Sequence, residues 1–213
     1  MAKLVIGTDK TVGVPAIVKE VEKQEKYSLL SRVKDDSNHD VGIVVGYHTD
    51  ANSQKYAVVC LNKEYRTSGS FTWLNGAGVV DGLPAYTSLA VFDAKETATY
   101  NCDKILSYAQ EHGYTSTATN ECRNHSFIID GVTYYGQLPT LTELINILEH
   151  RGVVNRDDPS SSGTSIQSTY NYWSSQQNST TLAWAVGGYS GYFLFSRDAG
   201  LVRVLPILEI PIN

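Results

Sequence analysis

The sequence predicts an α+β fold with two helices and antiparallel strands, preceded by an extended N-terminal arm. Three features predict it. Two apolar runs separated by a polar turn lie within residues 41–61, two capped amphipathic patterns occupy the middle of the chain, and closely spaced short strands fill its C-terminal part. Strands grouped at the two ends of a helical middle are typical of an α+β domain.

Charge and cysteine content exclude several classes of function. The formal net charge is −5 and the 17 Lys and Arg residues form no basic cluster, so neither nucleic acid nor an anionic membrane is expected as a partner. No apolar run approaches the roughly 18 residues that span a bilayer, and the N-terminus lacks the apolar core of a signal peptide. The three cysteines, an odd number without a CxxC motif, predict neither disulfide nor metal site.

The chain divides into an arm, residues 1–37, and a domain, residues 38–213. The arm contains the short apolar pieces 4–6 and 12–14, then the mixed-charge stretch 19–26, and none of these builds a core by itself. We expect the apolar pieces of residues 1–35 to be buried against the surface of a partner protein, so that this segment acts as an anchoring and assembly element.

In the domain, residues 41–47 and 56–61 predict two largely buried strands. A first helix is expected to start at Asp93, with Glu96 completing a capping box, and to end at Gly113. A second helix is expected to start at Thr140, with Glu143 three residues later, and to end at Arg151-Gly152. After a loop over 155–168, residues 182–186, 191–196 and 201–207 predict three strands joined by tight turns.

Several local motifs in this order resemble bacterial and phage domains of the C-type-lectin-like fold. The resemblance covers about residues 85–210 and rests on Leu138-Pro139-Thr140, Glu143-Leu144, Trp173-Ser174-Ser175, Ala183-Trp184 and Arg203-Val204-Leu205-Pro206. Two departures are Gln137, where such domains usually carry Arg, and Arg203-Val204-Leu205-Pro206, where they usually have Arg-Pro-Val. Residues 7–15 also resemble the leading segment of fibre proteins in the virions of gut phages.

The resemblance implies a binding face between the Trp-Ser-Ser strand and the last strand. Aromatic residues near hairpin turns offer rigid contact area, and nearby amides supply adaptable hydrogen bonds. The candidate ligand-binding residues are Gln176, Gln177, Asn178, Trp184, Tyr189, Tyr192, Phe193 and Arg197. The alternative is that this region is an ordinary solvent-exposed hairpin with half-buried aromatic residues and no ligand. Trp184 is as well suited to a place in the core as to contact with a ligand.

Two further residues are expected to be structural. Trp173 is expected in the core, and Arg203, in an apolar strand, must meet an acceptor if it is buried. The calcium motifs of animal sugar-binding lectins do not occur, and Asp157-Asp158 is expected to be solvated, so no metal site and no cofactor are predicted. The histidines show no metal-ligand spacing, and neither a Gly-x-Ser-x-Gly motif nor a phosphate loop occurs.

These observations predict a non-enzymatic phage virion fibre or decoration protein, on the head or the tail, that binds a host-surface glycan or protein. Its expected place is the virion, made in the host cytoplasm, and the expected assembly is a homo-oligomer, with a trimer favoured. Three alternatives remain: a purely structural capsid or fibre subunit, a bacterial cell-surface adhesin, and an enzyme with an unrecognised site.

Overall fold

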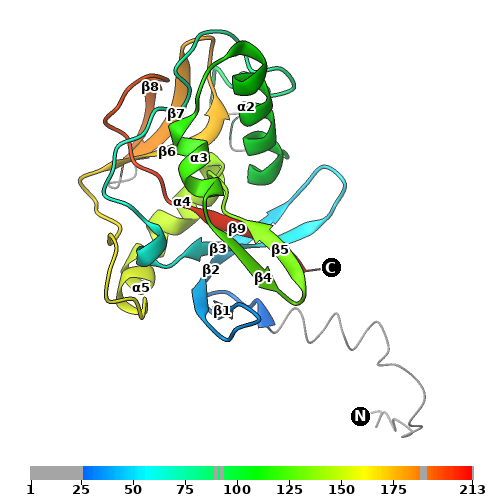
Figure 1. Ribbon diagram of the computed structural model, residues 1–213, viewed down its shortest axis with the longest axis vertical. Coiled ribbons are helices and arrows are strands. Elements are labelled where there is room, and N and C mark those ends of the chain that lie inside the picture. Colours follow the sequence, from blue (N-terminus) through cyan, green and yellow to red (C-terminus); the bar gives the residue numbers. More distant parts are fainter. Residues whose placement is uncertain (1–25, 89–90, 92–93, 188–190, 213) are drawn as a thin grey trace, which may run out of the picture.

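The computed structural model describes residues 26–88, 91, 94–187 and 191–212. Within these residues the chain forms four α-helices and three antiparallel sheets, which confirms the α+β class (Figure 1). Residues 1–25 of the expected anchoring element, 1–35, lie outside the described residues.

The largest sheet, called here the main sheet, has the strand order β1-β2-β3-β9. Its strands are β1 (Arg32–Lys34), β2 (Asp40–Thr49), β3 (Lys55–Leu61) and β9 (Ile207–Pro211). The two strands expected over 41–47 and 56–61 are therefore confirmed. Asp50 shapes the turn between them because its carboxylate accepts the backbone N–H groups of Asn52 and Gln54.

A second sheet, the C-terminal sheet, contains β6 (Asn171–Gln177), β7 (Leu182–Gly187) and β8 (Tyr192–Ser196) in that order. The prediction of a third strand over residues 201–207 is wrong. Val202 and Arg203 form only isolated bridges, to Phe71 and Tyr172, and the chain then crosses to the main sheet as β9. Pro206 lies at the crossing, where it cannot donate to a ladder.

The first long helix is α2 (Ala98–His112), which ends at Gly113 with a left-handed φ of 68° as expected. Its expected start is wrong, and Asp93 itself lies outside the described residues. Thr97 caps the helix instead, and the carboxylate of Glu209 on β9 accepts the N–H groups of Ala98 and Thr99 (2.9 and 2.8 Å). Because Glu209 is 111 residues away from Ala98, no local pattern signals this cap.

The second expected helix, α4 (Leu141–Glu149), has the predicted capping box between Thr140 and Glu143. It ends two residues early, and the separate short helix α5 (Arg151–Arg156) follows. Four further elements were not predicted: α3 (Thr117–Arg123), the 3-10 turn η1 (Lys63–Tyr65), and the two strands of a hairpin, β4 (Ser126–Ile129) and β5 (Val132–Tyr135).

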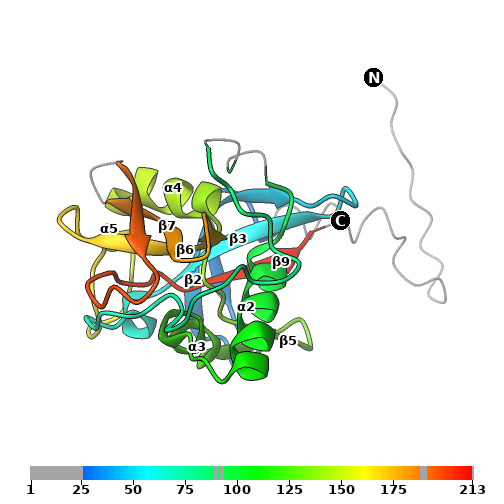
Figure 2. The same ribbon diagram turned by 90° about the horizontal axis from the view of Figure 1, so that it is seen from above.

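Strands β6 and β7 of the C-terminal sheet are buried on both faces, and they separate the hydrophobic core into layers. On β7, Trp184 and Val186 pack with α4 and the main sheet, whereas Ala183 and Ala185 pack with α2 and the segment from 71 to 83. A third cluster lies between the main sheet and the β4–β5 hairpin. Figure 2 shows α4 and α2 on different sides of the strands.

The arm boundary expected at residue 37 is too late. Tyr27 and Val33 are fully buried in the third core cluster, and β1 pairs with β2. Residues 26–36 also hold the β4–β5 turn, because the Asp36 carboxylate accepts the N–H groups of Asp130 and Gly131. The folded domain therefore begins by residue 26.

We expect a chain that starts at Lys26 to match the full chain in its free energy of unfolding. A chain that starts at Asn38 loses Tyr27 and β1, and removal of buried side chains of this size costs about 3 kcal/mol or more. Urea denaturation of the three chains followed by tryptophan fluorescence measures the difference. Equal stability of the Asn38 chain would contradict this boundary.

A buried carboxyl pair joins α4 to the main sheet. Glu143 is 1% exposed, and one oxygen of its carboxyl group accepts from the backbone N–H and the hydroxyl of Thr140. Burial, and then the charge of Glu209, raise the pKa of Glu143 well above its ordinary value. A proton on Glu143 relieves the repulsion between the two carboxyl groups and supplies a donor between them.

Because its folded pKa is raised, Glu143 stabilises the domain fully below its unfolded pKa of about 4.3, and that contribution is lost as pH rises toward the folded value. Glu143→Gln removes the charge and keeps an acceptor and a donor. We expect this variant to exceed the wild type by on the order of 1 kcal/mol at pH 8, with the gap closing near pH 4.

Glu149→Gln on the exposed side of the same helix is the matched control and should leave the pH profile unchanged. Chemical denaturation of the three proteins across this pH range gives the measurement. If the Glu143→Gln profile runs parallel to that of the wild type, Glu143 is not the group that titrates.

Candidate functional site

The two residues expected to be structural lie as follows. Trp173 on β6 is fully buried, as expected, and its indole N–H donates to the carbonyl of Phe71 at 2.8 Å. Arg203 is half-buried, and its guanidinium lies over the ring of Tyr170, 3.3 Å from the centroid. Stacking on an aromatic face accommodates a cation without an acidic partner.

The three amides expected to bind ligand are buried instead, and they satisfy backbone groups. Gln176 accepts from the N–H of Leu141, and Gln177 accepts from that of Val80. The Gln177 amide also donates to the carbonyls of Val80 and Leu83. Asn178 donates to the carbonyl of Tyr86, so none of the three presents a free amide at the surface.

Trp184 and Arg197 are also placed in the interior. The indole N–H of Trp184 donates to the carbonyl of Tyr86, and its ring belongs to the core. Arg197 is 1% exposed, which overturns its expected place on a solvent-exposed turn. Its guanidinium donates to the carbonyls of Gly78 and Ser179 and to Gln177, and it packs 4.7 Å from the Trp73 ring centroid.

Arg197 is a buried cation that carbonyl oxygens stabilise. No carboxylate within the described ranges forms an ion pair with it, and burial lowers its pKa to about 10. Its backbone carbonyl accepts from the N–H groups of Trp73 and Leu74. Arg197 therefore attaches the end of β8 to the irregular segment that precedes α2.

The part of the expected face that remains at the surface is β8. Tyr192 and Phe193 are 44% and 45% exposed, as expected of a binding face. Leu194, the next residue of β8, is 42% exposed and was not among the expected site residues. Tyr189 lies outside the described residues. β8 is an edge strand that pairs with β7, and successive side chains point to opposite sides, so apolar groups are exposed on both faces.

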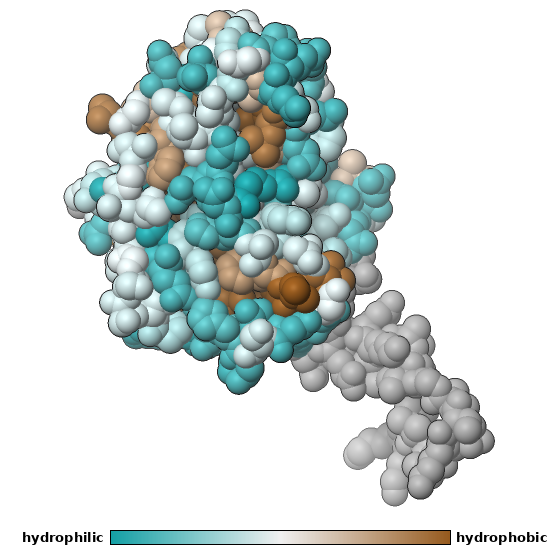
Figure 3. Space-filling model, viewed as in Figure 1, coloured by the Kyte–Doolittle hydropathy of each residue, from teal (hydrophilic) through white to brown (hydrophobic). Residues whose placement is uncertain are grey.

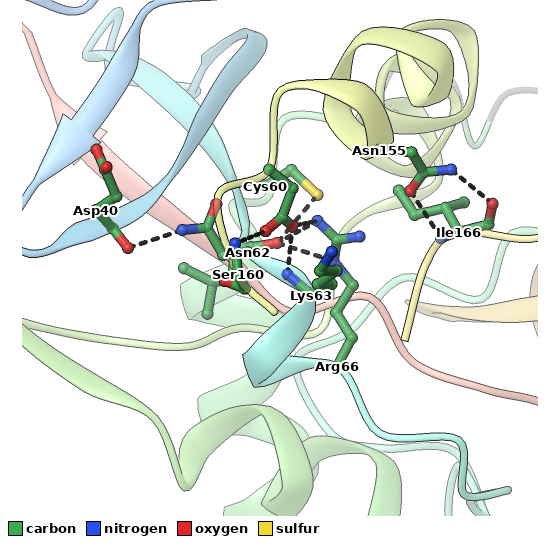
Figure 4. Close-up of polar contacts among 10 residues, drawn as sticks. Asp40, Cys60, Asn62, Lys63, Arg66, Asn155, Ser160 and Ile166 are labelled. Atoms are coloured by element: carbon green, nitrogen blue, oxygen red, sulfur yellow. Dashed lines mark hydrogen bonds and ion pairs between the residues drawn. The ribbon is translucent and has the colours of Figure 1, made fainter. Parts of the chain in front are cut away.

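The acidic loop after α5 is not solvated as a whole, which corrects the expectation for Asp158. Asp157 is exposed and pairs with Arg156, whereas Asp158 and Arg66 form an ion pair whose side chains are 1% and 2% exposed. Asp158 also accepts from the N–H groups of Lys63 and Ser160, and Figure 4 shows this network at the end of β3. The buried Asp158 carboxylate therefore joins this loop to Arg66 and to the backbone of Lys63.

The three cysteines lie in the interior of the domain. Cys60, Cys102 and Cys122 are free and buried, and burial raises the pKa of each thiol. Among the described residues no group of three or more His, Cys, Asp and Glu side chains is arranged to hold a metal ion. No helix in the same residues is both long and apolar enough to cross a membrane.

Comparison with known proteins adds no further constraint on this site. No protein-family model matches the chain. No curated protein and no solved structure matches it either.

The free energy of unfolding tests whether Arg197 holds the end of β8 against the segment that precedes α2. Arg197→Ala removes the guanidinium donor of the Gly78 and Ser179 carbonyls and the packing on Trp73. Each buried acceptor left without a donor costs about 1–3 kcal/mol, so we expect a loss of about 3 kcal/mol or more. Arg156→Ala is the matched control because its ion pair is exposed, and exposed pairs contribute about 0–1 kcal/mol. Urea titration of both variants measures this, and near-equal losses would contradict the bracing role.

Proposed function

We propose that this chain is a non-enzymatic phage virion fibre or decoration protein whose domain, of the C-type-lectin-like fold, binds a host-surface molecule through β8. The single observation that carries the proposal is the exposure of Tyr192, Phe193 and Leu194 on an edge strand. Natural edge strands usually carry charge, proline or a bulge that prevents pairing, whereas this one exposes apolar groups on both faces.

The chemistry of β8 favours a protein among the possible host molecules. Exposed aromatic side chains are enriched at protein interfaces, and an edge strand can extend its sheet by pairing with a strand of a partner. No strand within the residues that the structure describes pairs with the outer edge of β8. The rigid support beneath it comes from Arg197 and β7.

The order of elements supports the fold assignment within this proposal. Two principal helices, α2 and α4, precede a long loop and the C-terminal sheet, which matches the order on which the family resemblance rests. The motif residues also have structural roles, since Thr140 caps α4 and Trp173 fills the core. In this proposal residues 1–25 anchor the domain to other virion proteins.

The rival function is that of a structural subunit, for which β8 would pack against a second copy. One set of variants separates the two. Tyr192→Thr, Phe193→Thr and Leu194→Thr combined keep strand-forming side chains while removing the apolar surface. We expect the triple variant to fold and to lose binding to cells of the bacterial host in flow cytometry.

A matched control is the pair Ile128→Thr and Val132→Thr on the β4–β5 hairpin, where both side chains are about half exposed, 53% and 50%. Figure 3 shows hydrophobic residues gathered over this hairpin. The control should bind host cells as the wild type does. If the β8 variant still binds but dissociates in sedimentation analysis, β8 is a subunit contact and the structural alternative replaces this proposal.

A further inference from the structure

Strand β5 of the β4–β5 hairpin has one edge that is almost entirely unpaired. The hairpin forms a sheet of two strands, and a bridge between Gln137 and Ile207 links it to the main sheet through two hydrogen bonds of 2.8 and 3.1 Å. Beyond that bridge, no strand of the described residues pairs with the outer edge of β5. Figure 1 shows β5 and β9 as neighbours, although they do not join into one sheet.

The pairing of the hairpin shows which backbone groups this edge presents. The carbonyl of Ile128 accepts from the N–H of Asp36, outside the hairpin, so Ile128 and the opposite Thr133 form a pair whose backbone groups point outward. Such pairs alternate along an antiparallel ladder, so Tyr135 points outward as well. The Tyr135 carbonyl accepts from the side chain of Gln137. The Tyr135 N–H and both backbone groups of Thr133 have no partner among the described residues.

The residues of β5 lack the features by which natural edge strands avoid pairing. The sequence Val132-Thr133-Tyr134-Tyr135 carries neither charge nor proline, and all of these residue types favour strands. Val132 and Tyr135 are each 50% exposed, and they lie on opposite faces because successive side chains alternate. A strand added to this edge would therefore find an apolar neighbour on each face.

The space beside β5 admits one extended segment. A hollow of about 260 Å³ is lined by Thr133 and Tyr135 of β5 and by Tyr56 and Pro211 of the main sheet. Because the main sheet closes the far side, a second copy cannot bring its own β4–β5 hairpin edge to edge with this one. A single peptide strand needs no such room, and it binds a sheet edge through main-chain hydrogen bonds.

The part of residues 1–25 best suited to this edge is 4–6, Leu-Val-Ile. The first described residue, Lys26, is held at the turn of the same hairpin, where its ammonium group pairs with Asp130 at 2.7 Å. The chain before it contains two apolar pieces, 4–6 and 12–14. The second piece has a glycine at its centre, which weakens a strand, whereas the first has two β-branched residues and no glycine.

The length of the intervening chain favours a second copy as the owner of the edge. Residues 7–25 extend to about 60 Å at roughly 3.3 Å a residue, whereas a domain of this size is about 40 Å across. Residues 4–6 can therefore reach past the domain to β5 of a neighbouring copy. Residues 15–25 extend to only about 36 Å, so 12–14 cannot.

We propose that copies of this chain assemble head to tail, with residues 4–6 of one copy added as a strand to β5 of the next. Each copy then has one donor segment and one acceptor edge, so the contact is heterologous and builds a ring or a filament. This contact specifies the anchoring role proposed for residues 1–25. It is measured by assembly alone, so host binding through β8 can hold where it fails.

Single prolines in the full chain remove either the donor or the acceptor. Val5→Pro disrupts the added strand, and Thr133→Pro removes an N–H that points away from β4, where an edge strand tolerates proline. We expect the wild type to associate in sedimentation velocity, and each variant to associate at least about tenfold more weakly, because main-chain hydrogen bonds are lost. Val12→Pro is the matched control in the other apolar piece, and it should associate as the wild type does.

Mixing the two variants separates a second copy from other occupants of the edge. Val5→Pro keeps β5 intact and Thr133→Pro keeps residues 4–6, so the mixture should form dimers and nothing larger. A mixture that stays monomeric would overturn the proposal. So would a wild type that is monomeric throughout, which is the result expected if residues 4–6 pair with β5 of their own chain or with a different protein.

A peptide probe keeps the proposal testable if Thr133→Pro does not fold. The peptide of residues 1–9 is titrated into the full-length Val5→Pro variant, and amide chemical shifts are followed by NMR. Saturable shifts at Thr133 and Tyr135 are expected, and the same peptide carrying Val5→Pro should cause none. Shifts confined to other elements, or no saturable shift, would contradict strand addition at β5.

Discussion

The structure depends on the way in which side chains of β6 and its neighbours satisfy the backbone of the long irregular segment between β3 and α2. From 66 to 97 this segment contains almost no regular secondary structure in its described part, so its backbone groups need other partners. Gln177, Asn178, Trp184 and Arg197 supply them by hydrogen bonds to residues 78–86. The sheet and the segment are therefore one cooperative unit, and neither is expected to form without the other.

Local signals in the sequence were sufficient for part of this fold. The capping box of Thr140 and Glu143 is complete within four residues, so α4 starts where predicted. The start of α2 was misplaced because its second cap, Glu209, comes from the last strand. The last strand was predicted over 201–207 but lies at 207–211, because apolar residues continue through both stretches and only the pairing with β3 shows which of them forms the strand.

The candidate site shows the same division. Residue type predicted the exposure of Tyr192 and Phe193, because a short strand between turns leaves large aromatics at the edge. Residue type did not predict the burial of Gln177 and Arg197. Polar side chains are expected at the surface unless buried acceptors are available, and here backbone carbonyls accept from both.

The three buried thiols can report how often the layers of the hydrophobic core open to solvent. Cys60 belongs to the core layer beside the main sheet, whereas Cys102 and Cys122 belong to the layer beneath α2 and α3. A thiol reagent reacts with the thiolate of an exposed cysteine, so labelling requires that the surrounding layer separate first. Labelling rates at the individual cysteines therefore measure how often each half of the interior comes apart, and equal rates would mean that the two layers open as one.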